Sequence, residues 1–126
     1  MTPTEALLVK GGFTIRFHPG VVDDVRDHED DNPGCWQEMK EILFSVRDGT
    51  ARSRDWDAPL SQTGADIGEL RNTMFPRHYR LYVHAERESN ELLVLLFTWK
   101  PDGPAGLPLQ DTHIEIASGR LITWPN

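Results

Sequence analysis

The run "ELLVLLFTWK", residues 91–100, constrains the fold more than any other part of this chain of 126 residues. Neighbouring side chains of a strand point to opposite faces, and from Leu92 to Trp99 almost all of them are apolar. A strand that is apolar on both faces needs cover on both sides of its sheet. We therefore expect a central strand here, with other elements packed above and below it.

Two segments before this run have the period of strands with one buried face. They are "IGELRNTM", residues 67–74, and "RHYRLYVHAE", residues 77–86. The charged stretch "ERESN" suits an exposed turn before the third strand. The three segments predict an antiparallel meander packed on a helix. In the middle strand one face carries Tyr79, Leu81, Val83 and Ala85, and the other carries His78, Arg80, Tyr82 and His84.

The N-terminal half predicts a strand followed by a hairpin of two helices. "GFTIRFHP", residues 12–19, alternates apolar and polar side chains, and Pro19 suits the first turn of a short helix with Val21, Val22 and Val25. A longer helix is expected over residues 33–48, with Asn32 as its cap and Gly49 at its end. Its buried face would carry Trp36, Met39, Ile42, Leu43 and Val46.

The remaining segments complete an α+β fold. Residues 49–66 show the apolar period of neither a helix nor a strand, so they are expected to form a long loop. We expect a functional reason for a loop of this length. Leu109, Ile116 and Ala117 fit a last helix that Gly119 would end, and "RLITW" would add a short strand. We expect one domain over residues 1–126, with residues 1–11 as an N-terminal extension. It would be a small antiparallel sheet on a two-helix hairpin, in the order β-α-α-β-β-β-α.

The charge of the chain is acidic and unevenly distributed. A net charge of −7 weighs against a chain that binds phosphate backbones over its whole surface. Residues 67–100, in contrast, carry five basic and four acidic side chains. The run "DDVRDHEDD" places six carboxylates around one arginine, but their spacing is irregular and the turn glycine of a calcium loop is missing. We expect a solvated helix face there and no metal site.

Two further features bear on the environment of the protein. Cys35 is the only cysteine, so it has no disulfide partner in the chain and is expected to be a small buried residue. The apolar run before Lys10 is too short for a signal peptide or a membrane anchor, which favours a cytoplasmic protein without a membrane partner. The four tryptophans are expected in the core or at its edge.

Three segments of the chain together form a recognisable pattern: "FTIRFHPGVVDDV", "APLSQTGADIGELRNTMFPRHYRLYVHAE" and "LLVLLFTWKPDG". They resemble the RelE/ParE toxin superfamily, most closely its phage-derived HigB-like branch. The one RelE-like domain that this implies covers residues 1–126. In that family a strand leads into a helical hairpin, and a leucine-arginine pair precedes a "YRLxY"-like strand and an apolar strand that ends in lysine. Leu70-Arg71, "YRLYV" and Lys100 take those places here, and "IEIASGR" resembles the closing helix of phage-type members.

The resemblance implies an mRNA endonuclease that acts on the ribosome and is held inactive by a cognate antitoxin, in some systems a helix-turn-helix protein. A ribose 2′-hydroxyl would attack its own phosphate, and fixed guanidinium groups would stabilise the charge on the phosphoryl oxygens without a metal or other cofactor. The implied catalytic residues are Arg71, Arg80, His84 and Lys100, and the implied substrate-binding residues are Arg77, His78 and Tyr82.

The same residues allow a second interpretation, in which the chain is a non-catalytic protein of this fold that acts by protein binding, including ParE-like gyrase inhibition. After Lys100 the only basic residue is Arg120 and there is no tyrosine. Arg71 and Arg80 would then pair with Glu69 or Glu86 across a solvated sheet face, and His78 and His84 would be solvent-facing polar residues. The acidic net charge favours this second interpretation.

Overall fold

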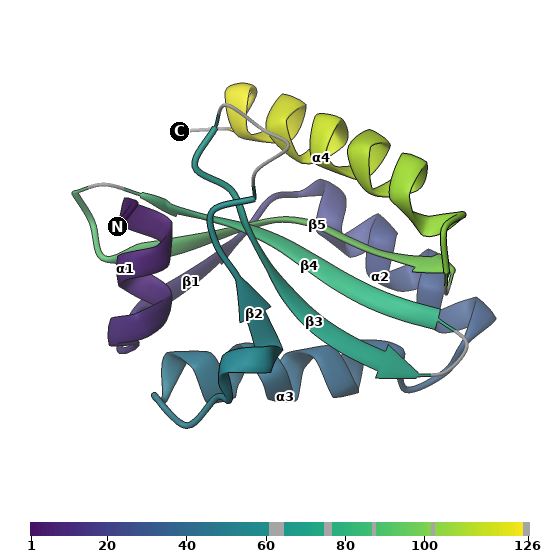
Figure 1. The fold of residues 1–126 in the computed structure, drawn as a ribbon, viewed down its shortest axis with the longest axis horizontal. Helices are drawn as coiled ribbons and strands as arrows, with labels where there is room; N and C mark the ends of the chain where they lie inside the picture. The colour runs from purple at the N-terminus through teal and green to yellow at the C-terminus, as the bar shows by residue number, and fades with distance from the viewer. Residues whose placement is uncertain (61–64, 75–76, 87, 102, 125–126) are drawn as a thin grey trace.

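A computed structural model describes residues 1–60, 65–74, 77–86, 88–101 and 103–124, and its ribbon is drawn in Figure 1. Parts of the expected 49–66 loop and of the "ERESN" turn lie outside these described residues. The elements are α1 (Pro3–Lys10), β1 (Thr14–Phe17), α2 (Gly20–Asp31), α3 (Cys35–Arg47), the short 3-10 helix η1 (Ser53–Asp55), β2 (Trp56–Asp57), β3 (Gly68–Met74), β4 (Arg77–Glu86), β5 (Glu91–Pro101) and α4 (Gly106–Ile122).

The strands form one sheet in the order β1-β5-β4-β3-β2. β3, β4 and β5 are the expected antiparallel meander, so this prediction is confirmed. The expectation of a wholly antiparallel sheet is wrong, because β1 runs parallel to β5. The chain between them, which includes α2, α3 and the strands β2 to β4, provides the long connection that parallel neighbours need in place of a tight turn.

The prediction of a central strand is also confirmed. Leu92, Leu93, Val94, Leu95, Leu96 and Phe97 of β5 are all buried. In Figure 1 α3 lies below the sheet and α4 above it, so each face has its cover. The core on the α3 side includes Met39, Leu43, Leu81 and Phe97, and the core on the α4 side includes Tyr82, Leu95, Leu96, Ile114 and Ala117.

The N-terminal segment is part of the fold. No periodicity in residues 1–11 predicted a helix, yet α1 packs beside β4 and buries Leu7 and Leu8. Thr4 is completely buried, and its hydroxyl accepts a hydrogen bond from the Ala85 amide (2.9 Å) and donates one to the Asp66 carbonyl (2.9 Å). These contacts attach the expected extension to the sheet.

The start of α3 differs from the prediction. Asn32 is not its cap, because the side-chain amide of Asn32 donates to the hydroxyl of Tyr79 (3.0 Å). The carboxylate of Glu29 instead accepts hydrogen bonds from the amides of Gly34 (2.8 Å) and Trp36 (2.9 Å). The carboxylate of Glu29 on α2 therefore pairs with free backbone amides at the N-terminus of α3. A negative charge is favourable there because the helix dipole is positive at its N-terminus. Cys35 is buried, as expected.

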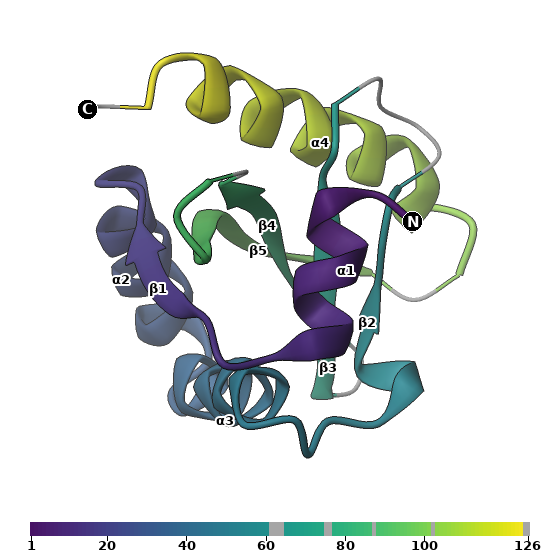
Figure 2. The ribbon, with the colours of Figure 1, turned by 90° about the vertical axis from the view of Figure 1, so that its left-hand side faces the viewer.

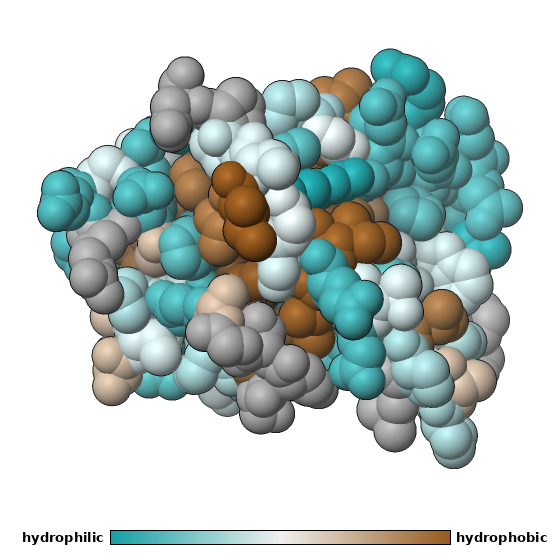
Figure 3. All heavy atoms as spheres, turned by 90° about the horizontal axis from the view of Figure 1, so that it is seen from above, coloured by the Kyte–Doolittle hydropathy of each residue, from teal (hydrophilic) through white to brown (hydrophobic). Residues whose placement is uncertain are grey.

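Helix α4 is longer than expected. It continues through Gly119 to Ile122, so the predictions that Gly119 ends the helix and that "RLITW" forms a strand are wrong. Figure 3 views the molecule from the α4 side and shows apolar atoms near the middle of this face among hydrophilic ones. Leu109 and Ile116 contribute exposed apolar surface on this helix. None of the helices in the described part of the chain is long and apolar enough to cross a membrane.

The acidic run is a solvated face only in part. Asp23, Asp27 and Asp30 are exposed, as expected. Asp24, on the inner side of α2, forms a two-pronged ion pair with Arg120 of α4 (2.6 and 3.0 Å). The Asp24 carboxylate also accepts a hydrogen bond from the Phe97 amide (3.1 Å), so it satisfies a backbone donor at the edge of β5.

We predict that Arg120→Ala lowers the free energy of unfolding by on the order of 3 kcal/mol, because it leaves the carboxylate of Asp24 mostly buried without its partner. Urea unfolding followed by circular dichroism measures this loss. The control is Arg26→Ala, which breaks an exposed pair with Asp23 and should cost less than about 0.5 kcal/mol. Equal losses in the two variants would show that the Arg120 pair has no special structural role.

Candidate functional site

The polar side chains of the meander lie in three rows on the α4 face of the sheet. Side chains alternate along each strand, so residues aligned across β3, β4 and β5 share a face. The rows, from the open end of the sheet toward the middle of α4, are Thr73, His78 and Lys100, then Arg71, Arg80 and Thr98, then Glu69, Tyr82 and Leu96.

Glu69 is at the centre of this arrangement. Its side chain is buried, at 1% exposure, and one carboxylate oxygen accepts the Arg71 Nε (2.9 Å). The other oxygen lies 3.7 Å from the Arg80 Nε and accepts Gln110 Nε2 from α4 (3.4 Å). The structure thus contains the ion pairs with Glu69 that the sequence left open. A buried carboxylate requires such partners, and it fixes both guanidinium groups in return.

Lys100 and Tyr82 have altered proton affinities in this environment. The Lys100 ammonium donates to Gln110 Oε1 (2.8 Å), and burial, followed by the charge of Arg80, lowers the pKa of Lys100. Tyr82 is completely buried beside Glu69, and burial raises the pKa of its hydroxyl well above the usual value. Tyr82 is therefore neither exposed to a substrate nor a proton carrier near neutral pH.

Two of the expected site residues lie apart from the others. Arg77 points to the opposite face of the sheet, where it pairs with Asp31 and lies 4.4 Å above the ring of Trp99. His84 lies beyond Tyr82 toward the far end of β4, and its ring Nδ1 is 2.7 Å from the carbonyl of Asp66. The structure thus groups Arg71, Arg80, Lys100 and His78, and separates them from Arg77 and His84.

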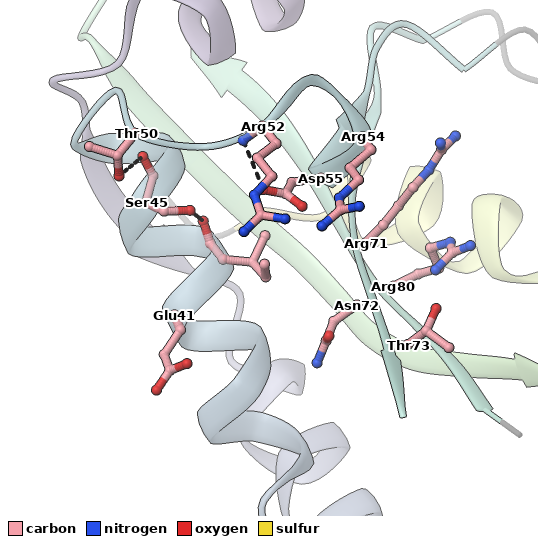
Figure 4. Close-up of a pocket in the computed structure, with 11 residues that line it drawn as sticks. Glu41, Ser45, Thr50, Arg52, Arg54, Asp55, Arg71, Asn72, Thr73 and Arg80 are labelled. Atoms are coloured by element: carbon pink, nitrogen blue, oxygen red, sulfur yellow. Dashed lines mark hydrogen bonds between the residues drawn. The ribbon is translucent and has the colours of Figure 1, made fainter. Parts of the chain in front are cut away.

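A cleft of about 670 Å³ opens beside the two central arginines. It lies beyond Trp56, the first residue of β2, which pairs with Leu70, so that residues 71–74 of β3 have no described strand on their outer side. Figure 4 shows Arg52, Arg54 and Asn72 directed into the space between α3 and β3, with Arg71 and Arg80 beyond the strand. Four arginines and two carboxylates line the cleft: Arg52, Arg54, Arg71, Arg80, Glu41 and Asp55.

Several donors at the cleft are unused. Arg52 and Arg54 are exposed, and within the described ranges neither has an ion-pair partner. The side-chain amide nitrogen of Asn72 is buried and makes no hydrogen bond to any residue that the structure describes, and the buried Nε of Arg80 has only its 3.7 Å ion pair with Glu69. Guanidinium and amide donors around one concave space favour an anion, above all a phosphate.

Sequence reasoning missed Arg52 and Arg54 as site residues. The available signal was the 49–66 loop itself, which was expected to have a functional reason and contains both arginines. Across the described ranges, no group of three His, Cys, Asp or Glu side chains could hold a metal ion. Comparisons with protein-family models, with curated proteins and with solved structures find no match to this chain.

We predict that Glu69→Gln destabilises the fold by on the order of 3 kcal/mol, because Arg80 would lose its charged partner beneath α4. Thermal and urea unfolding test this. Asp57→Asn is the matched control, since Asp57 pairs with the same Arg71 but is 52% exposed, and it should cost less than about 1 kcal/mol. If Glu69→Gln is as mild as the control, Glu69 is not the residue that organises the rows.

We also predict that acidification loosens α4 through His113. Burial lowers the pKa of His113, and its Nδ1 is a buried atom without a hydrogen bond inside the described ranges. The unfolded chain therefore binds this proton more readily, and stability falls as the pH drops from about 6.5 through the lower folded-state pKa. Amide exchange of α4 at pH 7 and pH 5 measures this change. His113→Gln should reduce the pH dependence, and an unchanged dependence would contradict the prediction.

Proposed function

We propose that the chain is a RelE/HigB-like toxin, a metal-independent endonuclease of mRNA, and that the arginine-lined cleft binds the RNA backbone. The observation that supports this most directly is the meeting of four arginines from three parts of the chain in an otherwise acidic protein. Clustered, partly unpaired guanidinium groups attract phosphates even where the net charge of the protein is negative. The cognate antitoxin and the ribosome are the partners that this proposal implies.

The arrangement of the elements supports the same proposal. A strand is followed by two helices and a meander, and the first strand lies beside the last one in the sheet. Leu70-Arg71, the "YRLYV" strand and Lys100 occur on consecutive strands of that meander. Fold alone does not determine activity, so the proposal depends on the site.

The site provides groups for each part of the reaction. The 2′-oxygen would attack the adjacent phosphorus and break its bond to the 5′-oxygen, which leaves a 2′,3′-cyclic phosphate and a 5′-hydroxyl. Arg71 and Arg80 would stabilise the charge on the phosphoryl oxygens. His78, whose Nδ1 is 3.1 Å from the hydroxyl of Thr73 at the cleft, would take the proton from the 2′-hydroxyl. Lys100, with its lowered pKa, would return a proton to the 5′-oxygen.

A second candidate function is non-catalytic protein binding, including ParE-like gyrase inhibition. The observation in its favour is that Glu69 and Asp57 already compensate the charge of Arg71, and Glu69 that of Arg80. Such a network stabilises the sheet without any substrate. RNA binding and cleavage by the purified protein separate the two candidates.

We predict that the double variant Arg52→Ala and Arg54→Ala weakens binding of a labelled single-stranded RNA by about tenfold or more. Each lost phosphate contact makes the negative slope of log affinity against log salt less steep by about 0.7, so the loss of two contacts makes it less steep by about 1.4. Both arginines are exposed and unpaired in the described structure, so the fold should be unchanged. Arg26→Ala on α2 is the control and should bind RNA as the wild type does.

Cleavage is tested with His78→Gln, which should retain RNA binding but lose cleavage by about a hundredfold or more, together with growth arrest on induction in bacteria. The expected product carries a 2′,3′-cyclic phosphate. If the wild-type protein neither binds RNA nor arrests growth, the nuclease proposal fails and protein binding takes its place.

A further inference from the structure

A second concave surface lies away from the arginine-lined cleft, between β1, α2 and α3. This β1 groove has a volume of about 660 Å³ and a mainly apolar lining, in which Ile15 and Trp36 are partly buried. Three large apolar side chains remain exposed in it: Phe17 (44%), Val22 (60%) and Phe44 (40%). Apolar surface gathered in one groove is typical of a binding site rather than of a bare protein surface.

The groove runs beside an open strand edge. β1 is the last strand of the sheet on its side, and its only described partner is β5. The amides of Thr14 and His18 donate to carbonyls on the β5 side, at Asn90 (3.0 Å) and Val94 (2.9 Å). Backbone groups alternate in direction along a strand, so those of Ile15 and Phe17 point away from the sheet. Figure 2 shows β1 at this edge of the molecule.

An open edge and an apolar groove together favour an extended occupant. A further strand on the β1 edge would hydrogen-bond to the backbone of Ile15 and Phe17, and every second side chain would enter the groove. A helix would leave those backbone groups unpaired. Natural proteins usually protect such an edge, since it is a template for pairing with another chain.

The charges indicate the kind of segment. Among the described residues, the charged side chains that line the groove are Lys40 and Arg47, although the chain as a whole carries a net charge of −7. A second copy of the chain is disfavoured, because joining the two β1 edges would bring together two acidic α2 helices, each with Asp23 and Asp27 exposed. We propose that β1 accepts an extended segment of another protein, with apolar residues at alternate positions and acidic residues between or beside them.

The proposal is tested by selecting randomised peptides of about 12 residues, displayed on phage, on the full-length protein. The selected peptides should have apolar residues at every second position and an excess of Asp and Glu. A synthetic copy of the strongest binder should protect the amides of Ile15 and Phe17 from hydrogen exchange. Its binding should weaken by about tenfold in Val22→Glu, because this change adds a negative charge to the apolar lining of the β1 groove. It should weaken similarly in Lys40→Glu, because this change replaces a positive charge of the lining by a negative one.

Matched controls separate the groove from other surfaces. Ile116→Glu changes an apolar residue of similar exposure on α4 and should leave peptide binding unchanged. The double variant of Arg52 and Arg54 should also bind the peptide normally, so failure of the RNA proposal would not affect this result. Unchanged melting temperatures show that Val22→Glu and Lys40→Glu are folded. Four outcomes would each overturn the proposal. The selected peptides could have apolar residues three or four apart, or their binding could survive Val22→Glu. The selection could also give no binder, or the chain could form a dimer that protects Ile15 and Phe17.

Discussion

The edge of β5 beyond Val94 is the constraint that organises the rest of the structure. β1 pairs with β5 only from Glu91 to Val94, although β5 continues to Pro101. Past that point Asp24 accepts the Phe97 amide, and Arg120 donates to the carbonyl of Leu95 (2.9 Å). The same two side chains form an ion pair, so buried backbone groups are satisfied while α2, β5 and α4 are joined. A Cβ atom at Gly20 would lie 2.8 Å from the Arg120 guanidinium carbon, which explains a glycine at the start of α2.

Holding α4 across the sheet determines which polar side chains are covered and which are accessible. Under the helix, Gln110 links the buried Glu69 to Lys100, and Tyr82 is sealed beside them. At the other end β2 reaches only to Trp56, which pairs with Leu70, so the outer edge of β3 is open where Arg71 and Thr73 meet the cleft. The same sheet face thus carries a stabilising network under α4 and, toward the cleft, a half-exposed Arg71 beside a more deeply buried Arg80. Catalytic and structural roles for Arg71 and Arg80 need not conflict, since ion pairs with Glu69 also fix the guanidinium positions.

The parts of the fold that could be predicted are those encoded in local patterns. The apolar run of β5, the alternation in β4 and the stripe on α3 each indicate an element without knowledge of its partners. The missed features depend on contacts between distant residues. Helix α1 is anchored by Thr4 to Ala85, 81 positions away, and the Asn32 side chain bonds to Tyr79, 47 positions away, which leaves the start of α3 to Glu29. Arg52 and Arg54 lie in a segment without periodicity, so only the structure shows that they face the same cleft as Arg80.

The acidic net charge does not by itself oppose RNA binding at the cleft, because of where the charges lie. The carboxylates of α2 are attached to an element that packs against β5, whereas the cleft opens at β3, with β4 between them. Two strand spacings amount to about 10 Å, which is close to the screening length of about 8 Å at physiological salt. An RNA phosphate bound at the cleft as proposed would therefore experience the nearby guanidinium groups more strongly than the acidic helix. The repulsion between the α2 carboxylates and the RNA phosphates acts mainly at low salt. There it would direct the RNA to the cleft side of the molecule and keep it away from the acidic side.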